Sequence, residues 1–358
     1  MDKKNKKQYS ASGLQINKGV VMEQHKEPAL SREIRLLSST ARRKMLEDWQ
    51  PVDNLDDISI EQIIMVAKMA RIIDERDGLP LYKKLMLCRR DNMMIMVDAV
   101  DDEPYISSQL GPLLHMKQAC IGGLKLALKA AKTTDARILV YKNITDLELK
   151  IPHFIEGVKV QRIGGMYPAE IRPGRSFAEF AGRRMMLVGA CALIHLYRAV
   201  CEGMMQTTVF VTVSGNCVAN CCNLEVSIGM SVTDVLDRCG LSDSPTRIVV
   251  GGSMTGEAVA DTDTTQILPT TRAVLAFKED ERDKKYLCIN CGRCAEVCPV
   301  DINPMRIYRA MELGRGDLLQ DMDFDRCIGC MCCSYECPAK LNLAAAIGSL
   351  IGKKGENP

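Results

Sequence analysis

The sequence predicts three consecutive units: an α/β domain with a largely parallel sheet, a small α+β module and a cysteine-dense helical domain. Three observations support this division. Apolar runs alternate with helical patterns between residues 93 and 201, two strands, a helix and a strand follow, and cysteine becomes dense beyond Lys284. The predicted boundaries are 1–50 for an N-terminal tail, 51–205 and 206–262 for the first two units, 263–285 for a linker and 286–358 for the last unit.

Composition and charge exclude several classes of protein. The 358 residues are 47% apolar and 26% charged, as in ordinary globular chains. Lys+Arg 47 against Asp+Glu 45 gives a net charge of +2, so no strong field recruits a polyanion, and nucleic acid is not an expected partner. No apolar stretch reaches the ~20 residues of a spanning helix, and no basic-then-apolar start marks export. We therefore expect a cytoplasmic protein without a transmembrane segment.

The α/β domain is predicted from the order of its elements. A helix within Ile58–Ile73 follows the acidic residues Asp56 and Asp57, and its apolar residues recur at helical spacing. Strands and helices then alternate in the order Met93–Val97, a helix near Leu113–Ala131, Ile138–Tyr141, Val158–Ile163, a helix near Ser176–Gly182, Met185–Val188 and a helix over Cys191–Cys201. Such alternation is typical of a largely parallel sheet.

The second unit is predicted from a change in this pattern. Strands are expected at Thr208–Val213, Leu224–Ile228 and Ile248–Val250, and Ser231 is the expected N-cap of a helix over Val232–Arg238. The Gly-, Thr- and Asp-rich stretch Gly252–Thr270 predicts a loop, and the charged run Lys278–Lys285 predicts the end of the linker.

Eight cysteines of the last unit repeat one spacing twice. Both runs read C-x2-C-x2-C-x3-C followed by proline, which is the signature of a bacterial two-cluster ferredoxin, whose fourth cysteine ligates the other cluster. The predicted ligands of cluster 1 are therefore Cys288, Cys291, Cys294 and Cys337, and those of cluster 2 are Cys327, Cys330, Cys333 and Cys298. Four-thiolate zinc sites are the alternative for C-x2-C pairs. Two complete runs favour two [4Fe-4S] clusters, which transfer electrons.

Three further cysteines lie in one polar turn. Cys217, Cys221 and Cys222 stand between two predicted strands, where they could bind a metal or act in thiol exchange. The remaining cysteines lie mostly on apolar faces, where a free thiol behaves as a small buried hydrophobe. Both interpretations of the three-thiol turn stay open.

Several segments resemble one family. Asp98–Tyr105 reads DAVDDEPY, which is similar to the segment NGAECEPY, and Tyr197–Gly203 reads YRAVCEG, which is similar to the helix YRAVxEG. With the module ending in IVVGG and the twin cysteine runs, the chain resembles the C subunit of Rnf-type ferredoxin:NAD oxidoreductases and, more distantly, the flavoprotein subunit of respiratory NADH dehydrogenase. The resemblance implies a Rossmann-like flavoprotein-type domain, a soluble-ligand-binding β-grasp (SLBB) module and a remnant of the family's N-terminal region within residues 1–50.

One departure bears on the flavin of that family. Where the family has the glycine-rich loop GGAGFPTxxKL, this chain reads DERDGLP over residues 74–80, and Tyr167–Arg172 lacks the family's paired glycines. A phosphate cradle needs backbone N–H groups brought close by residues without side chains, and carboxylates there oppose a phosphate. We therefore expect that FMN and NADH binding has been lost. If FMN is retained, the resemblance places it at Asp101, Glu103 and Gly78.

The predicted function is an electron-transfer protein that relays electrons through two [4Fe-4S] clusters to or from a protein redox partner. That partner is a reductase, a ferredoxin, a flavoprotein or a membrane Rnf-type complex, which would place the chain on the cytoplasmic face of a membrane. Relatives of this family also resemble electron donors to proline reductase and to cobalamin enzymes. The alternatives are an NADH-oxidising FMN/iron–sulfur subunit and a docking subunit with structural clusters.

Overall fold

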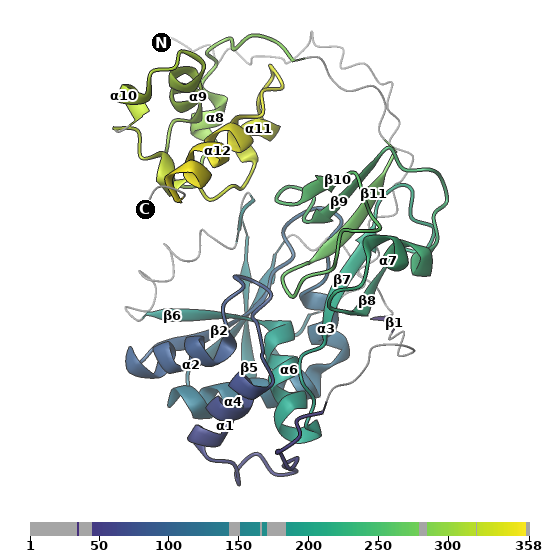
Figure 1. The fold of residues 1–358 in the computed structure, drawn as a ribbon. Helices are drawn as coiled ribbons and strands as arrows, with labels where there is room; N and C mark the ends of the chain where they lie inside the picture. Colours follow the sequence, from purple (N-terminus) through teal and green to yellow (C-terminus); the bar gives the residue numbers. More distant parts are fainter. Residues whose placement is uncertain are drawn as a thin grey trace, which may run out of the picture.

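The computed structural model describes residues 34–35, 45–142, 151–164, 167–169, 184–278, 285–319 and 321–355. The helix predicted near Ser176–Gly182 and most of the tail at 1–50 lie outside the described residues. The α/β domain, the module and the C-terminal domain follow one another along the chain, and Figure 1 draws them as three bodies.

The α/β domain contains a five-stranded sheet in the order β4-β5-β3-β2-β6. Its strands are β2 (Met94–Ala99), β3 (Ala136–Tyr141), β4 (Phe154–Ile155), β5 (Val158–Ile163) and β6 (Met185–Gly189). β2 pairs in parallel with β3 and with β6, β3 pairs in parallel with β5, and only β4 is antiparallel. The predicted parallel sheet is thus confirmed. Because β3 and β6 flank β2 on opposite sides, the order of strands reverses between β2 and β6, where doubly wound sheets bind ligands.

The helices of this domain gather on one face of the sheet (Figure 1). They are α1 (Ile60–Met69), α2 (Leu81–Arg90), α3 (Leu110–His115), α4 (Lys117–Ala131) and α6 (Ala190–Glu202). A capping box starts α1, because Ser59 accepts from the Gln62 N–H and Gln62 accepts from the Ser59 N–H. The single helix predicted near Leu113–Ala131 is two helices, which meet at Met116.

Two glycines allow α4 and α6 to pack closely. A Cβ atom on Gly123 would lie 1.9 Å from the carbonyl oxygen of Leu193, and one on Gly122 would lie 2.4 Å from the Tyr197 ring. The backbones therefore meet where a side chain cannot fit. Around this contact the apolar core of the domain includes fully buried Leu124 and Leu196.

The domain begins before its predicted first residue, 51. The Leu46 N–H donates to Gly203 at 2.8 Å, and the indole of Trp49 donates to Val200 at 2.9 Å. Both side chains pack on the helical core. Trp49, the only tryptophan, therefore reports on the folding of this domain.

The module is a six-stranded sheet in the order β1-β8-β7-β11-β9-β10, with α7 against it. The elements are β1 (Ile34–Arg35), β7 (Thr208–Ser214), β8 (Cys222–Ser227), α7 (Val232–Cys239), β9 (Arg247–Gly251), β10 (Glu257–Val259) and β11 (Ala273–Phe277). Ser231 caps α7 by accepting from the Asp234 N–H at 3.1 Å, as predicted.

The predicted linker at 263–285 was wrong in one part. β11 lies within it and is a central strand, parallel to β7 and antiparallel to β9. The sequence did not reveal this strand because a five-residue apolar run after a long polar loop has no distinctive period. The predicted loop Gly252–Thr270 also contains the short edge strand β10, and the predicted tail contributes β1 to the other edge.

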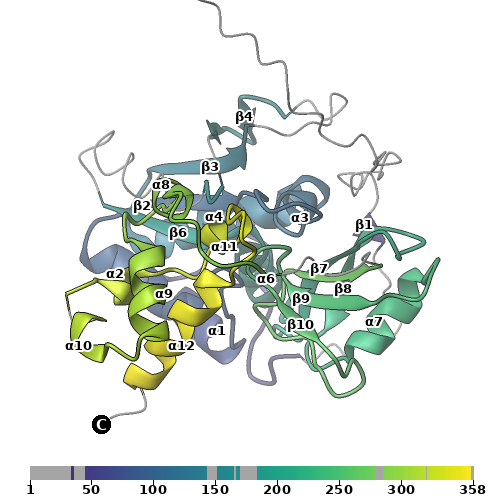
Figure 2. The ribbon, with the colours of Figure 1, turned by 90° about the horizontal axis from the view of Figure 1, so that it is seen from above.

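The C-terminal domain consists of short helices (Figures 1 and 2). They are α8 (Arg293–Glu296), α9 (Pro304–Glu312), α10 (Gly316–Leu319), the 3-10 helix η1 (Phe324–Arg326), α11 (Cys332–Tyr335) and α12 (Leu343–Gly355). Asn303 caps α9, and Pro304 stands in its first turn. Among the described residues, no helix has both the length and the apolar character needed to cross a membrane.

The Gly123→Ala substitution tests the contact between α4 and α6. The added methyl group collides with backbone rather than with a movable side chain, so we expect a loss of at least about 2 kcal/mol in the free energy of unfolding. Trp49 fluorescence during denaturant unfolding without oxygen measures it. The control is Gly164→Ala, where the new Cβ meets only the flexible Lys142 side chain. Equal stability of the two variants would contradict the packing argument.

Candidate metal centre

The two cysteine runs share one backbone conformation as well as one spacing. In the first run, Asn290 and Gly292 have φ values of +54° and +81°, so left-handed residues flank Cys291 on both sides. In the second run, Gly329 and Met331 flank Cys330 with φ values of +67° and +63°. Left-handed residues are one component of the backbone concavities that bind anions and iron–sulfur clusters, so the shared conformation is compatible with such a site in both runs.

Each run and the last cysteine of the other run enclose a cavity. The first cavity is lined by Cys288, Cys291, Cys294 and Cys337, together with apolar groups such as Met305 and Leu341. The second is lined by Cys298, Cys327, Cys330 and Cys333, and also by Cys332. The structure thus brings together both predicted sets of four thiols, including the exchanged cysteines Cys298 and Cys337.

The thiols around these cavities fit clusters better than single ions. Among the described residues, no three His, Cys, Asp or Glu side chains are placed to hold one metal ion. In a cluster each thiolate binds a different iron atom, so the ligands stand farther apart than around one ion. The donor set, sulfur with apolar surroundings, is that of a [4Fe-4S] site.

Cys332 lines the second cavity beside the predicted ligands and also reaches the α/β domain. Its Sγ donates to the carbonyl oxygen of Tyr167 at 3.6 Å. Tyr167 follows β5 in the α/β domain, so this contact joins the second cavity to that domain. The assignment of Cys333 rather than Cys332 as the ligand rests on the spacing of the cysteine run.

The helix between the two cysteine runs contributes side chains near both cavities. On α9, Met305 and Tyr308 pack with Cys294 and Cys337 on the side of the first cavity. Met311 packs against the buried residues Ile302, Ile307 and Ile347, as Cys298 and Cys327 do. The helix therefore contributes apolar side chains on the side of each cavity.

The acidic loop that replaces the family's glycine loop is buried. Asp74 is fully buried and accepts from Lys84 Nζ at 2.6 Å and from the Gly189 N–H at 3.2 Å. Gly78, with a φ of +72°, closes the turn by donating its N–H to the Asp74 carbonyl at 2.9 Å. Gly78 therefore serves a turn made by the chain itself.

Glu75 occupies the N-terminus of α6. Its two carboxyl oxygens accept from the Cys191 and Ala192 N–H groups, each at 3.0 Å. A Cβ atom on Gly189 would lie 2.1 Å from Glu75 Oε1, so the chain passes too close to admit a further group there. Burial, reinforced by the neighbouring Asp74 charge, raises the pKa of Glu75 to about 8. The helix end that could bind a phosphate is thus filled by the chain's own side chain.

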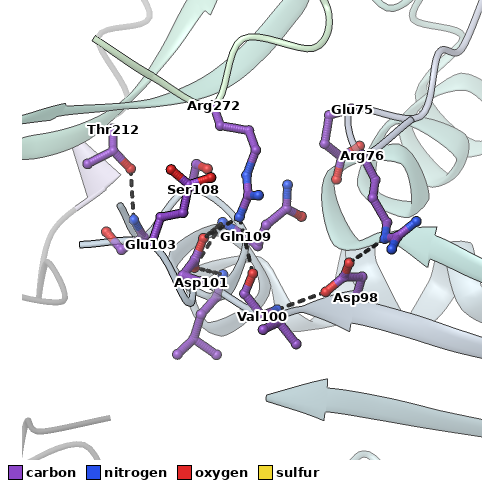
Figure 3. Close-up of polar contacts among 12 residues, drawn as sticks. Glu75, Arg76, Asp98, Val100, Asp101, Glu103, Ser108, Gln109, Thr212 and Arg272 are labelled. Carbon is purple, nitrogen blue, oxygen red and sulfur yellow. Dashed lines mark hydrogen bonds and ion pairs between the residues drawn. The ribbon is translucent and has the colours of Figure 1, made fainter. Parts of the chain in front are cut away.

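The other two residues expected near a flavin are also used internally. Asp101 accepts from the Leu110 N–H at 2.8 Å at the start of α3 and faces Arg272 Nη2 at 3.4 Å (Figure 3). Burial raises the pKa of Asp101 to about 6. Glu103 accepts from the Met254 N–H at 2.8 Å and from Thr255 Oγ1 at 2.7 Å. Asp101 therefore binds the backbone at the start of α3, and Glu103 binds the module.

The region between the carboxyl ends of β2 and β6 is consequently closed by side chains. Asp98, near the end of β2, pairs with Arg76 Nε at 2.7 Å beside Glu75 (Figure 3). The acidic residues of this region are Asp74, Glu75, Asp77, Asp98 and Asp101. Its cationic residues are Arg76, Lys84 and Arg272. Arg76, Lys84 and Arg272 are each paired with a carboxylate of this group. The arrangement therefore favours these internal ion pairs over an added phosphate.

The structure separates the three-thiol turn. Cys217 Sγ donates to Asn216 Oδ1 at 3.6 Å, and Cys221 Sγ donates to the Val218 carbonyl at 3.9 Å. Cys222 instead contacts Cys239, a residue that the sequence offered no reason to include, with 3.5 Å between the sulfur atoms. A single-metal site at the turn has no support among the described residues.

Comparison with known families defines the class. Residues 287–341 match the family 4Fe-4S dicluster domain, and residues 210–258 match the SLBB domain. The chain is therefore an iron–sulfur protein that carries its dicluster domain on an α/β and SLBB scaffold, as predicted.

Curated relatives then place it more narrowly. Over most of its length the chain is homologous to the C subunits of Rnf and other ion-translocating oxidoreductases. It is 26% identical to the C subunit of the proton-translocating ferredoxin:NAD(+) oxidoreductase complex of Clostridium ljungdahlii, over 75% of this chain and 62% of that protein. It is 26% identical to the C subunit of the Na(+)-translocating ferredoxin:NAD(+) oxidoreductase complex of Acetobacterium woodii, over 72% and 62%. The match thus spans less than two thirds of each relative.

Solved structures support the fold. The NAD+-reducing [NiFe]-hydrogenase in its air-oxidized state gives a TM-score of 0.51 at 17% identity, over 63% of this chain and 47% of that chain. Its H2-reduced state gives 0.51 at 14% identity, over 65% and 50%. At this identity the likeness is one of architecture.

Paired substitutions test the exchanged cysteines. Cys288→Ala and Cys337→Ala should each lower bound iron from about eight to about four atoms per chain, and their combination should lower it no further, because both line one cavity. Combining Cys288→Ala with Cys298→Ala should remove nearly all iron. Iron released by acid from protein purified without oxygen measures each variant.

The control for these variants is Cys332→Ala, which removes the neighbouring thiol that faces Tyr167 and should keep about eight iron atoms. If the pair Cys288 and Cys337 loses all iron while the pair Cys288 and Cys298 keeps about four, each cluster takes all its ligands from one run, and the exchange is refuted.

Glu75→Gln tests the buried carboxyl group. The raised pKa of Glu75 means that the folded protein holds a proton more tightly than the unfolded chain between pH 4.5 and about 8, so stability falls as pH rises through this window. Glutamine cannot lose a proton, so it removes that loss. The free energy of unfolding, followed by Trp49 fluorescence at pH 5 and pH 8, should show the variant gaining on the wild type as pH rises, by an amount on the order of a few kcal/mol. The control is Glu61→Gln on the exposed face of α1; a constant difference between Glu75→Gln and wild type would refute the assignment.

Proposed function

We propose that the chain is an electron-transfer subunit of an oxidoreductase complex, which relays electrons through two [4Fe-4S] clusters and binds no flavin. The observation that carries the proposal is the pair of thiol-lined cavities, each completed by a cysteine of the other run. Clusters bound there would supply one-electron transfer, and the shared ligands would keep the two sites adjacent.

The surroundings of the two sites indicate which site faces the external redox partner. The second site lies beside the α/β domain, because Cys332 contacts Tyr167. The first site lies near the surface, since Cys288 and Cys291 are exposed and their neighbours Leu287 and Ile289 are 90% and 67% exposed. Exposed apolar side chains around a redox centre suit a protein partner, which would exclude water on docking. We therefore place the external partner at the first site.

The contacts at the end of the sheet support the part of the proposal that concerns flavin. Glu75 takes the N–H groups at the start of α6, and Asp101 and Glu103 bind α3 and the module. In this proposal the α/β domain and the module position the dicluster domain relative to the partner protein. The partner protein supplies the catalytic cofactor. The named relatives are subunits of proton- and Na(+)-translocating oxidoreductase complexes. A peripheral position on the cytoplasmic face of a membrane complex is therefore part of the proposal.

Iron, flavin and reduction measured together test this function. Protein purified without oxygen should release about eight iron atoms and no FMN per chain. Dithionite should bleach the visible absorbance of the clusters, and NADH alone should leave it unchanged, because the proposed cofactors do not include a hydride acceptor. The control is the same titration after FMN has been added. NADH should still fail to bleach the absorbance of the clusters.

The alternatives give different results in this experiment. One FMN per chain, or bleaching by NADH alone, would establish the NADH-oxidising FMN/iron–sulfur subunit and overturn the account of the acidic loop. Clusters that resist both dithionite and reduced ferredoxin would assign them a structural role and overturn the relay.

A further inference from the structure

A pair of thiols in the module stands apart from both cluster sites. Cys222 is the first residue of β8, and Cys239 is the last residue of α7. Their sulfur atoms are 3.5 Å apart, in van der Waals contact. Cys239 is 2% exposed within the apolar core of the module, whereas Cys222 is partly exposed.

The backbone on both sides of this pair is fixed. The main-chain N–H of Asn220 and its side-chain amide both donate to the Cys239 carbonyl, at 3.2 and 3.1 Å, and the Ala219 N–H donates to Gly240 at 2.9 Å. On the strand side, Cys222 is paired with Val213 of β7. Contact between the two thiols is therefore built into the fold, because the turn before β8 is bonded to the end of α7.

We propose that Cys222 and Cys239 form a reversible disulfide when the protein meets an oxidised thiol compound. A disulfide needs its sulfur atoms about 2.05 Å apart, a shift that small side-chain rotations of two neighbouring cysteines can provide. The exposure of the two thiols sets their roles. Cys222 meets the oxidant first, and Cys239 resolves the product from the protected side.

The exchange balances with a low-molecular-weight disulfide as the oxidant. The Cys222 thiolate attacks one sulfur of glutathione disulfide, which forms a mixed disulfide and releases one glutathione thiolate. The Cys239 sulfur, after losing its proton to solvent, attacks the Cys222 sulfur, which forms the internal disulfide and releases the second glutathione. The two cysteines lose two electrons and two protons, and glutathione disulfide is reduced to two glutathione molecules.

The position of the pair connects it to the rest of the chain. Asn223, the next residue, is fully buried and bonds Ser107 of the α/β domain, with its amide donating to the Ser107 carbonyl at 3.1 Å. A covalent bond at Cys222 would therefore brace the strand that holds the module to the α/β domain.

Peptide mapping of the intact protein tests the proposal. Protein with its clusters in place is treated with glutathione disulfide without oxygen, quenched with acid, labelled with N-ethylmaleimide and digested. We expect a linked peptide pair joining Cys222 to Cys239, two labels fewer per chain, full reversal by dithiothreitol and no loss of iron.

Two variants serve as controls. Cys239→Ser should trap glutathione on Cys222, because no resolving thiol remains. Cys88→Ser removes another buried thiol, one that donates to the Met93 carbonyl at 3.4 Å, and should form the link as the wild type does. The proposal is overturned if the wild type keeps glutathione on Cys222 without linking, if Cys222 does not react, or if Cys222 links to Cys217 or Cys221 instead. Because mapping of the wild type decides the matter, it stands even if a variant fails to fold.

Discussion

The arrangement of the α/β domain and the module depends on the buried carboxylates at the carboxyl ends of β2 and β6. A carboxylate taken out of water is costly unless hydrogen bonds or cations compensate it. Glu75 finds its donors at the start of α6, Asp101 at the start of α3, and Glu103 in the loop after β9. Each compensation fixes the position of an element, so these acids orient two helices and bind the module to the sheet.

The same acids decide what this end of the sheet can do. In a nucleotide-binding sheet, free N–H groups at the reversal of strand order receive a phosphate. Here those of α6 are taken by Glu75, and the nearby cations are paired with Asp74, Asp98 and Asp101. The α/β domain keeps the architecture of its structural neighbours, while the N–H groups at the start of α6 bind the chain's own side chain. The C-terminal domain meets the α/β domain where Cys332 contacts Tyr167.

Predictions from the sequence were correct for elements that depend only on residues close together in the chain. The bounds predicted for Val158–Ile163 are those of β5, and Ser231 caps α7 as expected, because periodicity and capping are set by neighbours in the sequence. β11 was missed because its partners, β7 and β9, define it as a strand, and neither adjoins it in the chain. The contact between Cys222 and Cys239 was missed for the same reason, since it depends on how α7 packs against β8.

The sequence by itself determined the order of the three units, the parallel sheet and the two cysteine runs, because a fixed spacing of ligands is a property of the chain. It also indicated that a phosphate cradle was lost, since acidic residues stand where glycines are needed. Only the tertiary structure decided where those acids go. Glu75 meets its donors at the start of α6, 116 residues further along the chain, and Glu103 meets the Met254 N–H 151 residues further along. Such pairings arise from packing between distant segments, where burial and unsatisfied hydrogen bonds select the partner.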